Sequence, residues 1–158
     1  MNTLDRQNRI SNAFKKIHET IFYKIKGFEK SSKILDDVWE KKDLGQGNSI
    51  VIDDGIFFDK AGINFSCISG KSLPKSSVGN KSKSMGLPFF ASGVSVVFHP
   101  KNPYIPTSHL NVRYFCTYKE DKVFEEWFGG GFDLTPYILN EEDLSLIHIS
   151  EPTRHASI

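Results

Sequence analysis

The sequence predicts an α+β protein in which one helix is followed by an antiparallel β-sheet. Two observations carry this prediction. Apolar side chains in residues 3–26 recur with the period of an amphipathic helix. The chain after this helix alternates β-rich runs with turns of polar residues and glycine. Successive strands joined by short turns pair antiparallel, so we expect one sheet of that kind.

The N-terminal helix is predicted over residues 3–26. Its apolar positions recur every three or four residues, at Ile10, Phe14, Ile17, Ile21 and Ile25. Asn2 or Thr3 supplies a capping side chain, and Gly27 stands where a helix is expected to stop. His18 falls on the polar side of this helix, so we expect it to be solvated.

The next part of the chain predicts the first strands. Residues 30–47 favour a short helical or irregular segment that ends in glycine-containing turn residues. Residues 48–52 are typical of a strand, and 53–55 (Asp-Asp-Gly) predict a tight turn. Residues 56–58 then begin the return strand of a hairpin, and a further strand is predicted over 62–69.

Residues 69–84 are rich in Lys, Ser and Gly and lack apolar periodicity, so we expect a surface loop. Four lysines lie in this loop: Lys71, Lys75, Lys81 and Lys83. They attract an anionic substrate or only solvate the loop, and we favour the second interpretation.

Residues 93–115 contain two more predicted strands. An apolar strand over 94–98 ends at His99, and a loop with several prolines follows it. The next strand carries His109 and continues to residue 115. The segment 116–124 is predicted as a strand with a polar turn at 119–122.

Length, charge and cysteine content limit the class of protein. A chain of 158 residues is long enough for one domain with a core. A net charge of +1 argues against nucleic acid as a partner, because nucleic-acid binding requires a basic face. Two cysteines form no disulfide framework, and no apolar run reaches eighteen residues. We therefore expect a soluble, cytoplasmic protein without an integral membrane segment.

The last residues, 144–158, differ from the rest of the chain. The run from 144 to 154 (LSLIHISEPTR) looks like the translation of an adapter used in sequencing libraries. We therefore treat 144–158 as an artefactual, non-native tail and 1–143 as the N-terminal part of a single domain. On this interpretation the genuine protein continues beyond Asp143 in another sequence.

Three polar residues alternate along the strand that begins near His109. His109, Asn111 and Arg113 are each two residues apart, so their side chains point to one face. An imidazole titrates near neutral pH and transfers protons, whereas a guanidinium suits a carboxylate or phosphate. This set predicts a site for an acidic ligand. The alternatives are a histidine that serves backbone groups and an arginine in an ordinary ion pair.

The glycine triplet 129–131 has neither the spacing of a dinucleotide site nor that of a phosphate loop. It predicts backbone that approaches a ligand closely or adopts positive φ. Asp133 follows this triplet. It is either a carboxylate held near that ligand or an N-cap for residues 134–136.

The same motifs resemble those of a known family. Residues 93–115 read GVSVVFHPKNPYIPTSHLNVRYF, 127–137 read WFGGGFDLTPY, and 60–66 read KAGINFS. They closely resemble oxygen-dependent coproporphyrinogen III oxidase, and the resemblance covers most of residues 10–143. It implies a large, flat antiparallel sheet flanked by helices, and a homodimer in the intact protein.

The resemblance also implies an activity. Members convert the ring A and B propionates of coproporphyrinogen III to vinyl groups, which gives protoporphyrinogen IX in haem and porphyrin biosynthesis. The oxidant is O2, two CO2 are lost, and no organic cofactor is required. We expect this chain alone to be inactive, because the remainder of a family member carries further substrate-binding residues.

Functional roles carry over where the motifs match. The resemblance implies that His109 is the proton donor and that Asp133 engages the pyrrole N–H groups. Ser95 and the run Asn111, Val112 and Arg113 match substrate-binding positions. His99 and His109 match histidines described as divalent metal positions in bacterial members, whereas we expect no catalytic metal here.

Two other classes of protein compete with the enzyme. One is a catalytically inactive, truncated module that binds a tetrapyrrole, and it requires the end of the chain to be genuine. The other is a generic anion-binding α+β domain, and it requires the long motif match to be accidental.

Overall fold

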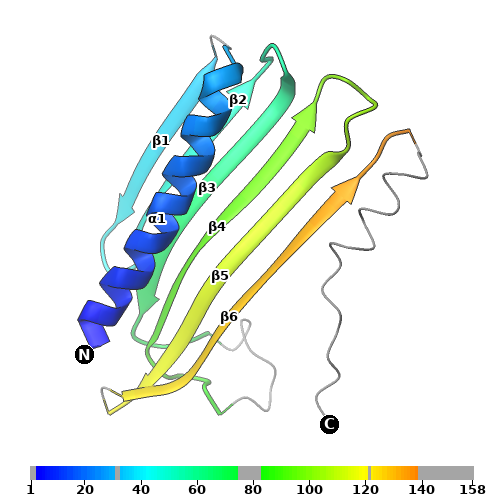
Figure 1. Ribbon diagram of the computed structural model, residues 1–158. Coiled ribbons are helices and arrows are strands. Elements are labelled where there is room, and N and C mark those ends of the chain that lie inside the picture. Colours follow the sequence, from blue (N-terminus) through cyan, green and yellow to red (C-terminus); the bar gives the residue numbers. More distant parts are fainter. Residues whose placement is uncertain (1–2, 31–32, 75–82, 121, 139–158) are drawn as a thin grey trace.

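The computed structural model describes residues 3–30, 33–74, 83–120 and 122–138. These residues form one helix and a six-stranded antiparallel sheet whose strand order is the chain order (Figure 1). The elements are α1 (Thr3–Phe28), β1 (Ile34–Lys41), β2 (Gly45–Asp53), β3 (Phe58–Gly70), β4 (Phe89–Pro100), β5 (Thr107–Lys119) and β6 (Lys122–Thr135). The predicted α+β class and antiparallel sheet are confirmed.

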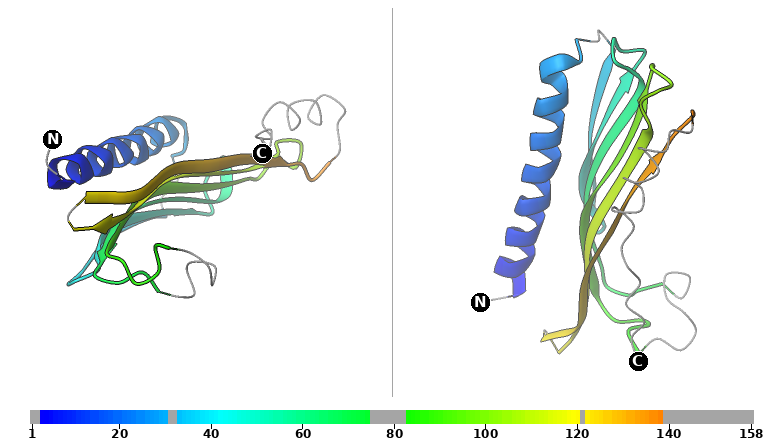
Figure 2. Two further views of the ribbon diagram at one scale, coloured as in Figure 1. Left: turned by 90° about the horizontal axis from the view of Figure 1, so that it is seen from below. Right: turned by 45° about the vertical axis from the view of Figure 1, so that its right-hand side comes forward.

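The helix α1 lies across one face of the sheet and packs against β3 and β4 (Figures 1 and 2). The core lies between them. Its buried residues come from α1 (Phe14, Ile25), β2 (Ile50, Ile52), β3 (Phe58, Ala61, Ile63, Phe65), β4 (Phe90, Val94, Val96) and β5 (Tyr114, Cys116). Every second residue of the central strands enters this core, so the residues between them face away from α1.

The predicted helix is confirmed, but His18 was placed wrongly. His18 is only 2% exposed, and its Nε2 lies 3.3 Å from the carbonyl oxygen of Ile63 in β3. It follows Phe14 by four residues and precedes Ile25 by seven, so it continues the buried stripe of α1. Burial lowers the pKa of His18, since a charged imidazole would lose its hydration there.

The predicted helical or irregular segment at 30–47 is also wrong. Ile34–Lys41 forms β1, which pairs along its whole length with β2. Most residues of β1 are exposed, because it is an edge strand of the described sheet, and it therefore lacks an alternating apolar pattern. Trp39 covers Gly47 of β2, where a Cβ atom would lie 2.5 Å from the indole. Backbone pairing outweighs local propensity in this segment.

The two strands predicted at 56–58 and 62–69 are one continuous strand, β3, with an irregular step between Phe58 and Lys60. The tight turn before it is confirmed, and Asp54 has a φ of 52°. Glu29, which is 1% exposed, accepts hydrogen bonds from the backbone N–H groups of Ile56, Phe57 and Phe58 at 2.7–2.9 Å. This buried carboxylate fixes the start of β3 to the end of α1.

The strand predicted over 116–124 is instead the end of β5 and the start of β6. The polar turn between them is confirmed, since Lys119 pairs with Lys122 and Glu120 has a φ of 50°. Part of the predicted surface loop, 75–82, and the whole tail, 144–158, lie outside the described residues. In the part of the chain that the structure describes, no helix is long and apolar enough to cross a membrane.

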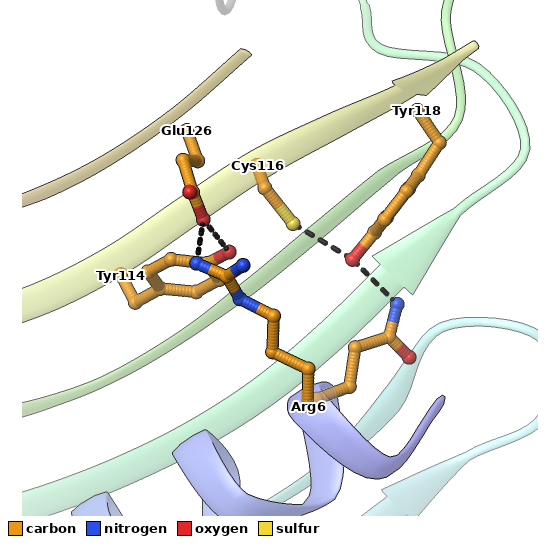
Figure 3. A network of polar contacts seen from close by, with 6 residues as sticks. Arg6, Tyr114, Cys116, Tyr118 and Glu126 are labelled. Carbon is orange, nitrogen blue, oxygen red and sulfur yellow. Dashed lines mark hydrogen bonds and ion pairs between the residues drawn. The ribbon is translucent and has the colours of Figure 1, made fainter. Parts of the chain in front are cut away.

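A polar network joins the N-terminal end of α1 to β5 and β6 (Figure 3). Arg6 Nη2 and the Tyr114 hydroxyl both donate to Glu126 Oε2, at 2.5 and 2.7 Å. Gln7 Nε2 donates to the Tyr118 hydroxyl at 2.7 Å. Burial, assisted by the bond to Glu126, raises the pKa of Tyr114, so its phenol remains a donor. The network holds β5 and β6 in register from the α1 side of the sheet.

Candidate active site

The predicted polar residues gather on the face of the sheet opposite α1, here called the open face. Side chains of directly paired residues in antiparallel strands point to the same side. Ser95 pairs with Asn111, and His109 pairs with Asp133. Arg113 lies two residues beyond Asn111, beside Gly93 and Gly129. The sheet therefore brings together all of the polar side chains that the sequence selected in residues 95–113 and 133.

His109 and Asp133 form a pair across β5 and β6. His109 Nδ1 lies 2.9 Å from Asp133 Oδ2, and the side chains are 40% and 59% exposed. A carboxylate only accepts hydrogen bonds, so Nδ1 carries the proton and Nε2 is left for a ligand. The Thr135 hydroxyl also donates to Asp133 Oδ2, at 3.2 Å. Such a pair can transfer a proton at Nε2 while the carboxylate fixes the ring.

A hollow also lies on the open face, over β3, β4 and β5. It has a volume of about 290 Å³. It is lined by β3 (Asn64, Ser66, Ile68), β4 (Ala91, Ser92, Gly93, Val94, Ser95) and β5 (Asn111, Val112, Arg113). Gly93 must lack a side chain, because a Cβ atom there would lie 2.6 Å from the backbone oxygen of Val112. Pockets that enclose a whole small molecule have volumes from about 300 Å³ upward. This hollow is at the lower end of that range, so it suits one part of a larger ligand.

The glycine triplet lies inside β6, and only Gly45 and Gly86 have positive φ among the described glycines. Of the two predicted explanations, positive φ is therefore wrong for 129–131. A Cβ atom on Gly131 would meet no atom within 4 Å, so open space lies above this residue. The N-cap interpretation of Asp133 is wrong as well, because Asp133 is a strand residue.

Val112 and Ser95 contribute to the hollow in different ways. The side chain of Val112 packs against the core on the α1 side, so only its backbone is left for the open face. Ser95 points to the open face beside Asn111. Asn64 and Ser66 also line the hollow, and sequence reasoning missed them. Their alternation in 60–66 matched that of the chosen residues and would have revealed them.

His99 lies close to His109, but no third ligand joins them among the described residues. Their ring centroids are 6.1 Å apart with the rings nearly perpendicular. Among the described residues, no group of three or more His, Cys, Asp or Glu side chains lies close enough to hold a metal. His109 also turns Nδ1 toward Asp133. These two imidazoles by themselves do not fit the ligand sets of protein-bound transition metals.

Fold and site together define an α+β protein with a row of polar side chains and an imidazole–carboxylate pair on one face of its sheet. The chain belongs to the coproporphyrinogen III oxidase family, whose model matches residues 9–154. The match contains all six strands and every residue of the open face named above. Membership makes the chain a coproporphyrinogen oxidase of porphyrin biosynthesis, an oxidative decarboxylase whose substrate is coproporphyrinogen III. The family inferred from the motifs is confirmed.

Proposed function

We propose that the reaction to which this chain contributes is the oxygen-dependent form and that it converts the ring A and B propionates. Each propionate would lose its carboxyl group as CO2 and a hydrogen from the carbon next to the ring. Two electrons and two protons pass to O2, which becomes H2O2, and a vinyl group remains. Two such steps give protoporphyrinogen IX.

The observation that carries this proposal is the arrangement of Arg113, the hollow and the His109–Asp133 pair on one face. Arg113 offers a fork of donors to a propionate. His109 lies four residues away along β5, about 13 Å in an extended strand. A substrate that presents propionates around a large ring can therefore reach both ends of the row. Ser95 and Asn111 lie between them and supply neutral hydrogen bonds.

Asp133 and His109 are assigned complementary roles. Asp133 accepts a hydrogen bond from pyrrole N–H groups and stabilises positive charge as the ring loses electrons. His109 acts as proton donor through Nε2 when both of its ring nitrogens are protonated, and Asp133 stabilises that charged form across the Nδ1 contact. The contacts at Oδ2 support this division, because they fix the imidazole. No hydrogen bond to Oδ1 of Asp133 is found among the described residues, so this oxygen is available to a pyrrole N–H group.

The proposal includes O2 as co-substrate, no organic cofactor and no catalytic metal. The electron-rich pyrrole ring is then the group that reacts with oxygen. A homodimer, which rests on the family resemblance, and a cytoplasmic location, which rests on the cysteine content and the lack of a long apolar run, also belong to the proposal. These 158 residues alone are proposed to be inactive, because the rest of a family member carries further substrate-binding residues.

Substitution at Asp133 tests the catalytic assignment. Asp133→Asn, introduced at the matching position of an intact family member, is expected to lower turnover of coproporphyrinogen III under air at least a hundredfold. Full turnover in that variant would remove Asp133 from the mechanism. Conversion of coproporphyrinogen III by the purified 158-residue chain would contradict its proposed inactivity. Tight binding without turnover in the intact protein would favour the inactive tetrapyrrole-binding module.

A further inference from the structure

A row of stacked aromatic side chains continues the open face beyond Arg113. The Phe115 and Trp127 rings are 5.5 Å apart at 28°, and the Phe89 and Phe115 rings are 6.3 Å apart at 21°. Phe115 is paired with Trp127 across β5 and β6, and with Ala91 across β4 and β5. Because Phe115 is two residues from Arg113, the rings begin about 7 Å along the strand from the guanidinium row.

Trp127 is placed as a surface for a ligand rather than as part of the core. Its neighbour Phe128 packs on Tyr114 on the α1 side, at 4.6 Å between centroids, so the indole lies on the open face. It is 44% exposed. A Cβ atom on Gly129 would lie 3.0 Å from the indole, which shows that the ring leans over Gly129 toward the row of Arg113.

The chemistry of the open face changes along the strands. The end with His109, Asn111 and Arg113 is polar, whereas the row of Ile68, Ala91, Phe115 and Trp127 is apolar. A porphyrinogen has the same mixed character, because each pyrrole ring has an apolar face and an anionic propionate. One pyrrole ring can therefore stack on an aromatic side chain while its propionate reaches a cation. Aromatic rings favour such offset stacking.

We propose that Phe115 and Trp127 form an aromatic subsite that stacks on one pyrrole ring of the substrate while Arg113 holds the propionate of that ring. Trp127 is then a positioning residue, since it sets the distance of the macrocycle from His109 and Asp133. This inference rests on the proposed function. The hollow that Gly93 and Arg113 help to line gives the propionate room beside the guanidinium.

Binding of coproporphyrin III, the stable oxidised counterpart of the substrate, tests the inference. The purified 158-residue chain is titrated with coproporphyrin III, and binding is followed by the porphyrin absorbance. Trp127→Thr keeps a strand-forming residue but removes the ring, so it is expected to weaken binding about five- to tenfold. Trp127→Phe retains a stacking ring and is expected to bind within about twofold of wild type. The porphyrin absorption shift expected with wild type should persist in Trp127→Phe and shrink in Trp127→Thr.

Trp39→Phe is the matched control. The chain has two tryptophans, and Trp39 lies on β1, at the opposite edge of the described sheet. This variant is expected to bind as wild type does. Phe115→Leu supplies a second variant within the row and should weaken binding as Trp127→Thr does.

The outcomes separate the two claims. If wild type binds and Arg113→Leu weakens binding, but Trp127→Thr and Phe115→Leu bind as wild type, the aromatic subsite is wrong and the proposed function stands. If wild type does not bind coproporphyrin III, or Arg113→Leu binds unchanged, the proposed function fails for this chain. Thermal unfolding of each variant shows whether a loss of binding reflects a loss of fold, and Phe115→Leu decides the question if Trp127→Thr unfolds.

Discussion

His109 of β5 and Asp133 of β6 face each other as a directly paired couple, with 2.9 Å between Nδ1 and Oδ2. Their relationship depends on the register of two strands and not on a loop. The turn between β5 and β6 and the irregular step between Thr117 and Tyr118 set that register, and the network of Arg6, Tyr114 and Glu126 supports it from the other face. Rigid strands suit His109, because its ring must keep Nδ1 directed at Asp133.

The pair predicts the tautomer of His109. Neutral His109 is expected to carry its proton on Nδ1, because Asp133 accepts there. Nitrogen chemical shifts of the imidazole, measured by NMR above pH 8, check this directly. Asp133→Leu removes the acceptor and should abolish the preference for Nδ1. His99, whose ring is 6.1 Å away, is the internal control and should keep its shifts; an unchanged His109 in Asp133→Leu would contradict the pairing.

Arg113 is expected to supply the largest single contribution to anion binding on the open face. Arg113→Leu should weaken coproporphyrin III binding about 10- to 100-fold, the worth of a charge-assisted contact. Arg113→Lys keeps the charge without the planar fork and should fall between Leu and wild type. Arg9→Leu removes the same charge from α1, across the sheet, and is the control. Equal weakening by Arg9→Leu and Arg113→Leu would mean that only net charge matters.

Substitution of Gly131 is expected to affect ligand binding and the free energy of unfolding in different ways. A Cβ atom there meets nothing within 4 Å, so Gly131→Ala should leave the free energy of unfolding unchanged or raise it by up to about 0.5 kcal/mol. The same methyl group projects from the open face and should weaken coproporphyrin III binding about tenfold. Gly27→Ala, also free of close contacts but at the end of α1, should stabilise without affecting binding. Urea unfolding and porphyrin titration measure the two effects; unaltered binding in Gly131→Ala would place the ligand elsewhere.

The sequence was informative where side chains repeat with the period of their element. His109, Asn111 and Arg113 were assigned to one face from spacing alone, and the structure places them there. The pairing partner of His109 was not predictable in this way. It depends on the register between β5 and β6, which is shifted between Thr117 and Tyr118 and cannot be read from either strand alone.

The failures share a physical cause. β1 was missed because an edge strand is held by backbone pairing and needs no apolar alternation. His18 was missed because a polar residue can occupy a buried helical position when a backbone carbonyl, here that of Ile63, satisfies it. Both depend on partners distant in sequence, which a local pattern does not contain.

The substitution Glu29→Gln is expected to lower the free energy of unfolding markedly, although it changes only one atom of the side chain. Its carboxylate accepts three backbone N–H groups at the start of β3, and Gly55 leaves the space that it fills. Glu29→Gln turns an N–H2 group toward those donors and should destabilise the chain by about 2–3 kcal/mol. Glu40→Gln, at an exposed position of β1, makes the same chemical change and should cost less than about 0.5 kcal/mol. Urea unfolding at pH 7 compares them, and similar midpoints would show that Glu29 does not hold the turn.

His18 predicts how stability depends on pH. Burial lowers its pKa in the folded chain, whereas in the unfolded chain it titrates near 6.5. As the pH falls through 6.5, the unfolded state therefore binds a proton that the folded state refuses. The contribution of His18 is fully present above that pH and is lost below it, until the folded imidazole also titrates.

His18→Gln retains a donor for the carbonyl oxygen of Ile63 but does not titrate. Its free energy of unfolding should fall less than that of wild type between pH 7 and pH 5. The carboxylates common to both proteins cancel in this comparison, so the difference in slope belongs to His18. Urea unfolding at half-unit steps of pH measures it. Parallel curves would mean that His18 titrates in the folded chain as it does in the unfolded one, which its burial under α1 contradicts.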